Sequence, residues 1–203
     1  MPSQYKIEDL YASHPALAGC RPAIDGAAAA IIACYEAEGK LLCCGNGGSA
    51  ADSDHIVGEL MKGFLRKRPV TDPRIDAELR PRLQGALPAI ALTHHGALAS
   101  AFANDVDPVM LYAQQVYGYA RPGDVVLGLS TSGNAANVVN ALTVAKAMGV
   151  VTIAMTGAGG GRLKALADIT ICVPETETYR VQELHLPDYH ALCAAVEAHF
   201  YTE

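Results

Sequence analysis

The stretch from residue 40 to residue 59, KLLCCGNGGSAADSDHIVGE, constrains the fold more than any other part of the chain. A continuous apolar run, Leu41 to Cys44, ends at the glycine-rich loop Gly45 to Ser49, and a helical pattern follows. That order predicts a buried strand, a tight loop and a helix. Such a loop leaves backbone N–H groups free at the helix N-terminus, where the helix dipole also favours negative charge. The stretch therefore predicts an anion-binding site.

Two pairs of polar side chains lie on predicted helices. His55 and Glu59 are four residues apart and share one helix face. Gln182 and His190 are about 80° apart on the helix predicted for Thr178 to Phe200, so both can face one cleft. Together the pairs offer two imidazoles, a carboxylate and an amide oxygen, a set that could hold zinc or a similar divalent ion. Each pair alone is more often a surface contact, and spacing does not show that the two helices meet.

Four more apolar runs of strand length follow the first, with helical patterns between them: Ala89 to Thr93, Val125 to Leu129, Val150 to Met155 and Ile169 to Val173. Continuously apolar strands that alternate with helices are typical of a parallel sheet covered on both faces. We therefore expect an α/β fold with about five parallel strands. Ligands of such sheets bind beyond the carboxyl ends of the strands.

The remaining pattern predicts helices and one excursion. The region 7–37 is helical with a break near 19–25, and the helix after the glycine loop continues to about Leu65. Residues 70–87 carry prolines and mixed charges, which predicts an excursion loop, either a lid or a solvated surface loop, with a short helix near 76–83. Further helices are predicted to end at Asn104-Asp105 and to cover 108–119, 135–148 and 162–167.

A second strand-to-helix loop has the sequence Ser130-Thr131-Ser132-Gly133-Asn134. Its hydroxyl groups and backbone donors, at a helix N-terminus, can hold a phosphate without a lysine. An ordinary Ser/Thr helix cap is the alternative interpretation. The chain lacks the GxxxxGK[ST] pattern, which argues against ATP or GTP hydrolysis.

The loop Gly45 to Ala50 also fits the loose GxGxxA dinucleotide pattern. That pattern needs an acidic residue about 20 positions later to hold a ribose. Here the corresponding region is Phe64 to Pro69, FLRKRP, which contains no acidic residue. A nicotinamide dehydrogenase is therefore disfavoured.

The composition limits the remaining classes of function. A chain of 203 residues predicts one domain, and its net charge of −6 provides no basic field for nucleic acid. The N-terminal residues lack a signal-peptide pattern, and no run of about 18 apolar residues predicts a membrane span, so we expect a soluble, cytoplasmic protein. The six cysteines show no CxxC spacing, and we expect reduced, buried thiols.

Residues 44–52, CGNGGSAAD, with His55 and Glu59, closely resemble the first motif of the phosphoheptose isomerases, within the sugar-isomerase (SIS) domain superfamily. The resemblance extends from about residue 25 to the C-terminus, through Asn104-Asp105, Gly123-Asp124-Val125, Ser130 to Asn134, and Val181-Gln182-Glu183 with His190. It implies a flavodoxin-like three-layer sandwich, a homotetramer with sites at subunit interfaces, and isomerisation of sedoheptulose 7-phosphate to D-glycero-D-manno-heptose 7-phosphate.

The resemblance also implies roles for individual residues. One zinc ion per subunit would be held by His55, Glu59, Gln182 and His190. Glu59 and His190 would transfer protons through an enediol, and the sequence does not decide which of them takes the carbon proton. The predicted substrate and phosphate contacts are Asn46, Gly47, Gly48, Ser49, Asn104, Asp105, Ser130, Thr131, Ser132, Asn134 and Gln182.

Two features depart from the family pattern: Ala135 replaces a serine that is frequent there, and the excursion at 70–87 is longer. The competing hypothesis is a non-catalytic SIS protein, similar to the one that binds the bacterial replication initiator, or a module that senses a phosphosugar. Relatives of the first kind lack residues matching Glu59 and His190, so both residues favour an enzyme.

Overall fold

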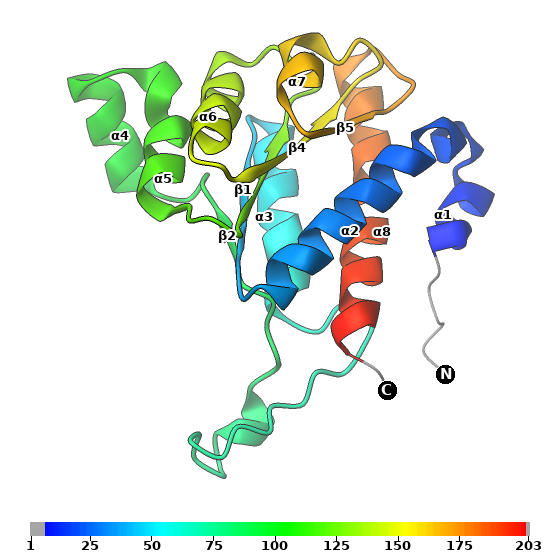
Figure 1. Ribbon diagram of the computed structural model, residues 1–203, viewed down its shortest axis with the longest axis vertical. Helices are drawn as coiled ribbons and strands as arrows, with labels where there is room; N and C mark the ends of the chain where they lie inside the picture. Colours follow the sequence, from blue (N-terminus) through cyan, green and yellow to red (C-terminus); the bar gives the residue numbers. More distant parts are fainter. Residues whose placement is uncertain (1–6, 202–203) are drawn as a thin grey trace.

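Five strands form one parallel sheet in the order β2-β1-β3-β4-β5 in this computed structural model, which describes residues 7–201 (Figure 1). Residues 1–6 and 202–203, which the predicted domain includes, lie outside the described part. The strands are β1 (Leu41–Cys44), β2 (Ala89–Ala91), β3 (Val125–Leu129), β4 (Val151–Thr156) and β5 (Ile169–Cys172). This order is that of flavodoxin-like sheets, so the predicted fold class is confirmed.

Helices cover both faces of the sheet, as Figure 1 shows. Side chains of consecutive strand residues point to opposite faces, and β1 therefore contributes to two cores. Leu41 and Cys43 belong to the core shared with α1 (Ile7–Ser13), α2 (Arg21–Glu36), α3 (Gly48–Met61) and α8 (Thr178–Phe200). Leu42 and Cys44 belong to the core shared with α5 (Leu111–Tyr119), α6 (Ala136–Ala147) and α7 (Gly161–Leu166). The helix α4 (Gly96–Asp105) lies beside α5 (Figure 1).

Three short 3₁₀ helices complete the elements: η1 (Pro15–Cys20), η2 (Arg80–Arg82) and η3 (Pro108–Met110). The prediction for the N-terminal region was wrong about the break. Helix α2 begins at Arg21 and runs through Gly26, and the interruption lies before it, in η1. Pro22 suits the first turn of α2 because no intrahelical partner exists there for its missing N–H.

The segment between α3 and β2 also differs from the prediction. Helix α3 ends at Met61 and not near Leu65, because the backbone N–H groups of 64–66 donate to a buried carboxylate instead. Within 76–83 only the three-residue η2 forms, in place of the predicted short helix. Figure 1 shows this segment extending away from the sheet and its helices. A single bridge, Pro69 to Gln84, joins its two ends.

The cysteines agree with the expectation of reduced, buried thiols, whereas the N-terminal helices differ from the expectation that no segment could span a membrane. All six cysteines are free, and all except the half-buried Cys172 are buried. Residues Pro15–Glu36 are long and apolar enough to cross a membrane by length and composition, contrary to the sequence-based expectation of no such segment. In the structure 39% of the most apolar window of this segment is buried, and Ile24 and Ile31 of α2 lie in the core against the sheet.

Candidate functional site

The two predicted anion-binding loops leave the sheet side by side. Cys44 of β1 is paired with Gly128 of β3, so the loops after these strands begin next to each other. They line a cavity of about 160 Å³ together with the first turns of α8. The lining residues are Asn46, Ser49, Leu129, Ser130, Thr131, Ser132, Ala135, Thr178 and Gln182. None of these carries a charge, so any anion here would be held by hydroxyl, amide and backbone donors.

A pair of amides ties the two loops together. Asn46 Nδ2 donates to Asn137 Oδ1 at 2.9 Å, and Asn137 Nδ2 donates back to Asn46 Oδ1 at 2.8 Å. Asn137 lies in the first turn of α6, three residues after Asn134. Asn137 is not among the predicted site residues, although its place at a helix N-terminus after the serine loop was a usable signal. The pairing orients Asn46 at the mouth of the cavity.

Glycine allows α8 to approach the first loop. A Cβ atom on Gly48 would lie 2.6 Å from Gln182 Nε2, so only glycine leaves room for this amide at the start of α3. Gly47, the residue before it, has a φ of 57°, a value that side chains disfavour. The loop therefore needs both glycines for its shape, and Gln182 lies against the loop backbone.

The serine loop presents hydroxyl groups that also stabilise its own backbone. Ser130 Oγ accepts from the N–H of Ala135 at 3.3 Å, and Ser132 Oγ accepts from the N–H of Asn134 at 3.2 Å. Each hydroxyl keeps its own proton for a ligand. Asn134 is placed differently from the prediction. Its side chain donates to the Ser132 carbonyl and accepts from the N–H of Arg162, and it is not a lining residue of the cavity.

Three of the four predicted metal ligands, His55, Glu59 and His190, meet further along the same two helices. The fourth, Gln182, lies at the cavity against Gly48 and not in this cluster. The helices lie side by side and parallel, because Gly48 contacts Gln182 near their starts and His55 contacts His190 further on. His55 Nε2 lies 3.4 Å from His190 Nε2 and 3.2 Å from Glu59 Oε1. His55 follows Ser49 by six positions in α3, which puts this cluster roughly 9 Å along the helix from the cavity.

One distance in this cluster, between the two imidazole nitrogens, matches the separation of two ligands of a tetrahedral zinc ion. Two imidazole nitrogens at 2.0–2.1 Å from zinc in tetrahedral geometry would be about 3.4 Å apart, the separation found between His55 and His190. Glu59 is also held by Lys62 Nζ at 2.9 Å. As they stand, the side chains of the described residues form no group of three or more His, Cys, Asp or Glu around one metal position. Glu59 Oε1 already lies 3.2 Å from His55 Nε2, so the ligand that would have to rearrange most is Gln182, which lies against Gly48.

Burial shifts the pKa values of His190 in this cluster and of Asp52 beside it. Burial and the neighbouring His55 lower the pKa of His190, against the opposite effect of Glu59, so His190 is neutral near pH 7. Burial raises the pKa of Asp52, and the hydrogen bond from Tyr189 and the nearby His55 oppose that rise. Neither Asp52 nor Tyr189 was selected from the sequence. The spacing of Asp52, three residues before His55, was the available signal for the first of them.

Asn104 and Asp105 are not brought to the cavity. They end α4, are exposed, and form a hydrogen bond with each other from Asn104 Nδ2 to Asp105 Oδ1 at 2.8 Å. Helix α4 lies on the face of the sheet opposite to α3 and α8 (Figure 1). Within one chain these two predicted substrate contacts stay apart from the others.

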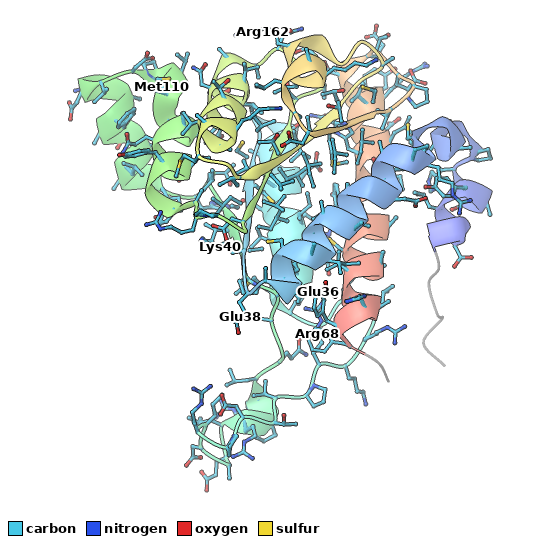
Figure 2. All side chains as sticks on the ribbon, in the orientation of Figure 1. Glu36, Glu38, Lys40, Arg68, Met110 and Arg162 are labelled. Carbon is cyan, nitrogen blue, oxygen red and sulfur yellow. The ribbon has the colours of Figure 1, made fainter. Side chains whose placement is uncertain are left out.

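A buried ion pair fixes α3 against α8 below the cluster. Arg68 Nε donates to Glu197 Oε1 at 2.8 Å, and both side chains are almost fully buried. The Arg68 guanidinium also donates to the carbonyls of Leu60 and Glu59, at 2.6 and 3.2 Å. Figure 2 shows Arg68 near the C-terminal end of α8. The pair therefore holds the end of α3 that carries Glu59.

Comparison with known proteins identifies close relatives. Residues 16–157 match the SIS domain family. The phosphoheptose isomerase of Rhodospirillum rubrum is 40% identical over 181 residues, which cover 89% of this chain and 88% of that protein. The enzyme of the same name from Methylibium petroleiphilum is 42% identical over 177 residues, 86% of this chain and 80% of that protein. The structure of phosphoheptose isomerase GmhA from Neisseria gonorrhoeae superimposes with a TM-score of 0.76 at 31% identity, covering 95% of this chain and 100% of that one.

Proposed function

This chain belongs to the SIS domain family and to the phosphoheptose isomerases within it, and on that premise we propose that it converts sedoheptulose 7-phosphate to D-glycero-D-manno-heptose 7-phosphate. The chain is a phosphosugar isomerase; the identity of the sugar is the proposed part. One observation carries the proposal most directly. A cavity of uncharged donors and a cluster of titratable side chains lie on the same pair of parallel helices, about 9 Å apart along α3.

The cavity would hold the phosphate end of the substrate. Ser130, Thr131 and Ser132 supply hydroxyl donors, and the N-terminus of α6 adds backbone N–H groups and a favourable dipole. Ser49, Asn46 and Gln182 also line the cavity. A phosphate fixed here would direct the sugar along α3 and α8, toward Glu59 and His190.

Isomerisation moves one proton between C1 and C2 of the sugar, while protons on the two oxygens redistribute. We assign these proton transfers to Glu59 and neutral His190. One of them removes the carbon proton to form the enediol, and the other donates and accepts protons at the two oxygens. The Glu59 carboxylate and the His190 imidazole lie 3.2 and 3.4 Å from the same atom, His55 Nε2, so both can reach one bound sugar.

His55, Glu59, Gln182 and His190 would hold one zinc or similar divalent ion per subunit. Imidazole nitrogens favour zinc over magnesium, and the 3.4 Å separation of the two imidazole nitrogens supports this choice. When bound, such an ion acts as a Lewis acid that stabilises negative charge developing on the sugar oxygens. Elemental analysis of protein prepared without chelator should find about one transition-metal ion per chain. Absence of such a metal, together with no effect of added zinc, would contradict the assignment.

A homotetramer with sites at subunit interfaces would explain two features of the single chain. The cavity of about 160 Å³ is smaller than the roughly 300–1,000 Å³ typical of small-molecule sites, and Asn104 and Asp105 lie away from it. In the assembly we propose, the end of α4 from another subunit closes the site, and the enzyme works in the cytoplasm. Light scattering at micromolar concentration should give a tetrameric mass; a monomer would refute the assembly.

The experiment that tests the function is a panel of ketose and aldose phosphates incubated with the parent protein and three variants. Glu59→Gln and His190→Asn should each lower kcat by roughly 10²-fold or more, the usual loss of a general acid or base. Glu183→Gln is the matched control, since Glu183 is an exposed carboxylate on the same helix as His190. If sedoheptulose 7-phosphate is not a substrate, the proposed sugar is wrong. If either active-site variant keeps the parent rate, that residue is not catalytic.

A further inference from the structure

Tyr189 connects the cluster to a carboxylate that the reaction does not use. Its hydroxyl oxygen lies 3.2 Å from Asp52 Oδ1 and 3.0 Å from His55 Nδ1. The side chain is 1% exposed, and its ring meets the rings of His55 and His190 edge to face, with centroids 5.4 and 5.0 Å apart. The hydroxyl is therefore held between Asp52 and His55 by a rigid ring.

The available protons determine the direction of these two hydrogen bonds. An ionised carboxylate only accepts, so the single hydroxyl proton of Tyr189 goes to Asp52. The Tyr189 oxygen then accepts, and His55 must donate from Nδ1–H. In a neutral imidazole the other nitrogen then carries the lone pair. That nitrogen, His55 Nε2, is the atom that faces His190 and Glu59.

We propose that Tyr189, oriented by Asp52, is a positioning residue that holds neutral His55 as the Nδ1–H tautomer and so leaves Nε2 free to bind a cation. The inference rests on the proposed metal site and assigns a purpose to two residues outside it. Histidine ligands of metals almost always donate their second ring N–H to a partner that fixes the tautomer, often a carboxylate. Here a tyrosine stands between the imidazole and the carboxylate.

Glu59 favours the alternative tautomer of His55, which carries the proton on Nε2. Glu59 Oε1 lies 3.2 Å from His55 Nε2 and would accept a proton placed there. A His55 that carries its proton on Nε2 cannot bind a cation through that atom. Without the Tyr189 hydroxyl, the remaining polar partners of the ring, Glu59 and His190, both lie at Nε2, and the Nε2–H form would gain population. By accepting from His55 Nδ1–H, Tyr189 therefore disfavours a hydrogen bond from His55 Nε2–H to Glu59.

The first test reads the tautomer in metal-free protein. Nitrogen-15 NMR of the imidazoles at about pH 8.5, where an ordinary imidazole is neutral, should show His55 protonated on Nδ1 in the parent. Tyr189→Phe should shift it toward the Nε2–H form. Asp52→Asn should act in the same direction, because an amide can donate to the Tyr189 oxygen and release the hydroxyl proton toward His55. Unchanged tautomers in both variants would overturn the inference.

The second test reads zinc affinity by competition with a chromophoric chelator, without substrate. Tyr189→Phe should weaken zinc binding by about 10- to 100-fold, the usual effect of removing such a partner. Tyr35→Phe is the matched control, since Tyr35 is also a buried tyrosine and its hydroxyl has no hydrogen-bond partner among the described residues. Its zinc affinity should equal that of the parent.

The two measurements separate this inference from the metal site itself. If the parent binds zinc and Tyr189→Phe binds it as tightly, the inference is overturned while the metal site stands. If the parent binds no zinc, the metal site fails, and the NMR comparison alone decides whether Tyr189 sets the tautomer of His55. Thermal melting of Tyr189→Phe and Tyr35→Phe shows whether each variant is folded.

Discussion

Replacing Glu197 with glutamine should be among the most destabilising single changes in this protein. The Glu197 carboxylate accepts four hydrogen bonds, from the backbone N–H groups of Phe64, Leu65 and Arg66 and from Arg68 Nε, at 2.7–3.1 Å. Four donors suit an acceptor-only group. A glutamine of the same shape brings two donors of its own, so its NH₂ group must face other donors. It also leaves the Arg68 charge buried without its anion.

The expected cost follows from that burial. Breaking a buried ion pair by removing one partner costs about 3–5 kcal/mol, because the remaining charge is uncompensated. For a chain of this size each kcal/mol lowers Tm by about 2–4 °C, so Tm should fall by roughly 10 °C. Arg68→Met should cost less, because Glu197 keeps its three backbone donors. The double variant should be less destabilised than the sum of the two single ones.

Urea denaturation at one fixed protein concentration measures these differences, since oligomerisation makes apparent stability concentration-dependent. The exposed carboxylate change Glu183→Gln supplies the control. Arg68 also binds the carbonyl of Glu59, so the variants should lose activity at temperatures where they remain folded. A Glu197→Gln protein within about 1 kcal/mol of the parent, well below the range for a broken buried pair, would refute the reasoning.

Two further predictions concern the phosphate cavity and the buried part of α8. In calorimetric titration, Ser132→Ala should weaken phosphosugar binding by about 1.5–3 kcal/mol, the scale of a hydrogen bond to a charged group. Ser100→Ala on α4, whose hydroxyl bonds its own helix, should leave affinity unchanged; if Ser132→Ala also binds as tightly as the parent, Ser132 is excluded from the site. Burial lowers the pKa of His185 to about 4. As pH falls from about 6.5 to 4, His185 is therefore protonated in the unfolded chain but stays neutral in the folded one, which favours unfolding. The protein should lose roughly 3 kcal/mol over that window through this group, and His185→Leu should remove that part of the loss in urea melts at several pH values; an unchanged pH dependence would contradict it.

The sequence predicted the strands that are continuously apolar and the loops that follow them. Leu41–Cys44 and Val125–Leu129 have the predicted bounds, because every residue in each is buried and no polar position disturbs the pattern. The meeting of their loops follows from the parallel register. The prediction of α8 was also correct across Pro187, since neighbouring packing outweighs one missing backbone hydrogen bond.

The parts that the sequence could not predict depend on contacts between distant residues. Phe64 to Arg66 look helical, yet their N–H groups bind Glu197, more than 130 residues away along the chain. The contact of His55 with His190 likewise joins two helices that only the fold places side by side. Tyr189 reads as an ordinary core residue, and its role depends on where its hydroxyl points. Residue spacing also gave no sign that Asn104 and Asp105 at the end of α4 would lie away from the cavity.

The most direct test of the central claim is hydrogen exchange between substrate and solvent. Sedoheptulose 7-phosphate incubated with the enzyme in deuterated water should acquire deuterium at C1, and the heptose product should carry it at C2, as followed by NMR and mass spectrometry. Glu59→Gln and His190→Asn should slow this exchange by roughly 10²-fold or more, and Glu183→Gln should not. If the parent protein binds the phosphosugar but neither carbon gains deuterium, the chain does not perform proton transfer through an enediol, and a phosphosugar-sensing module becomes the better account.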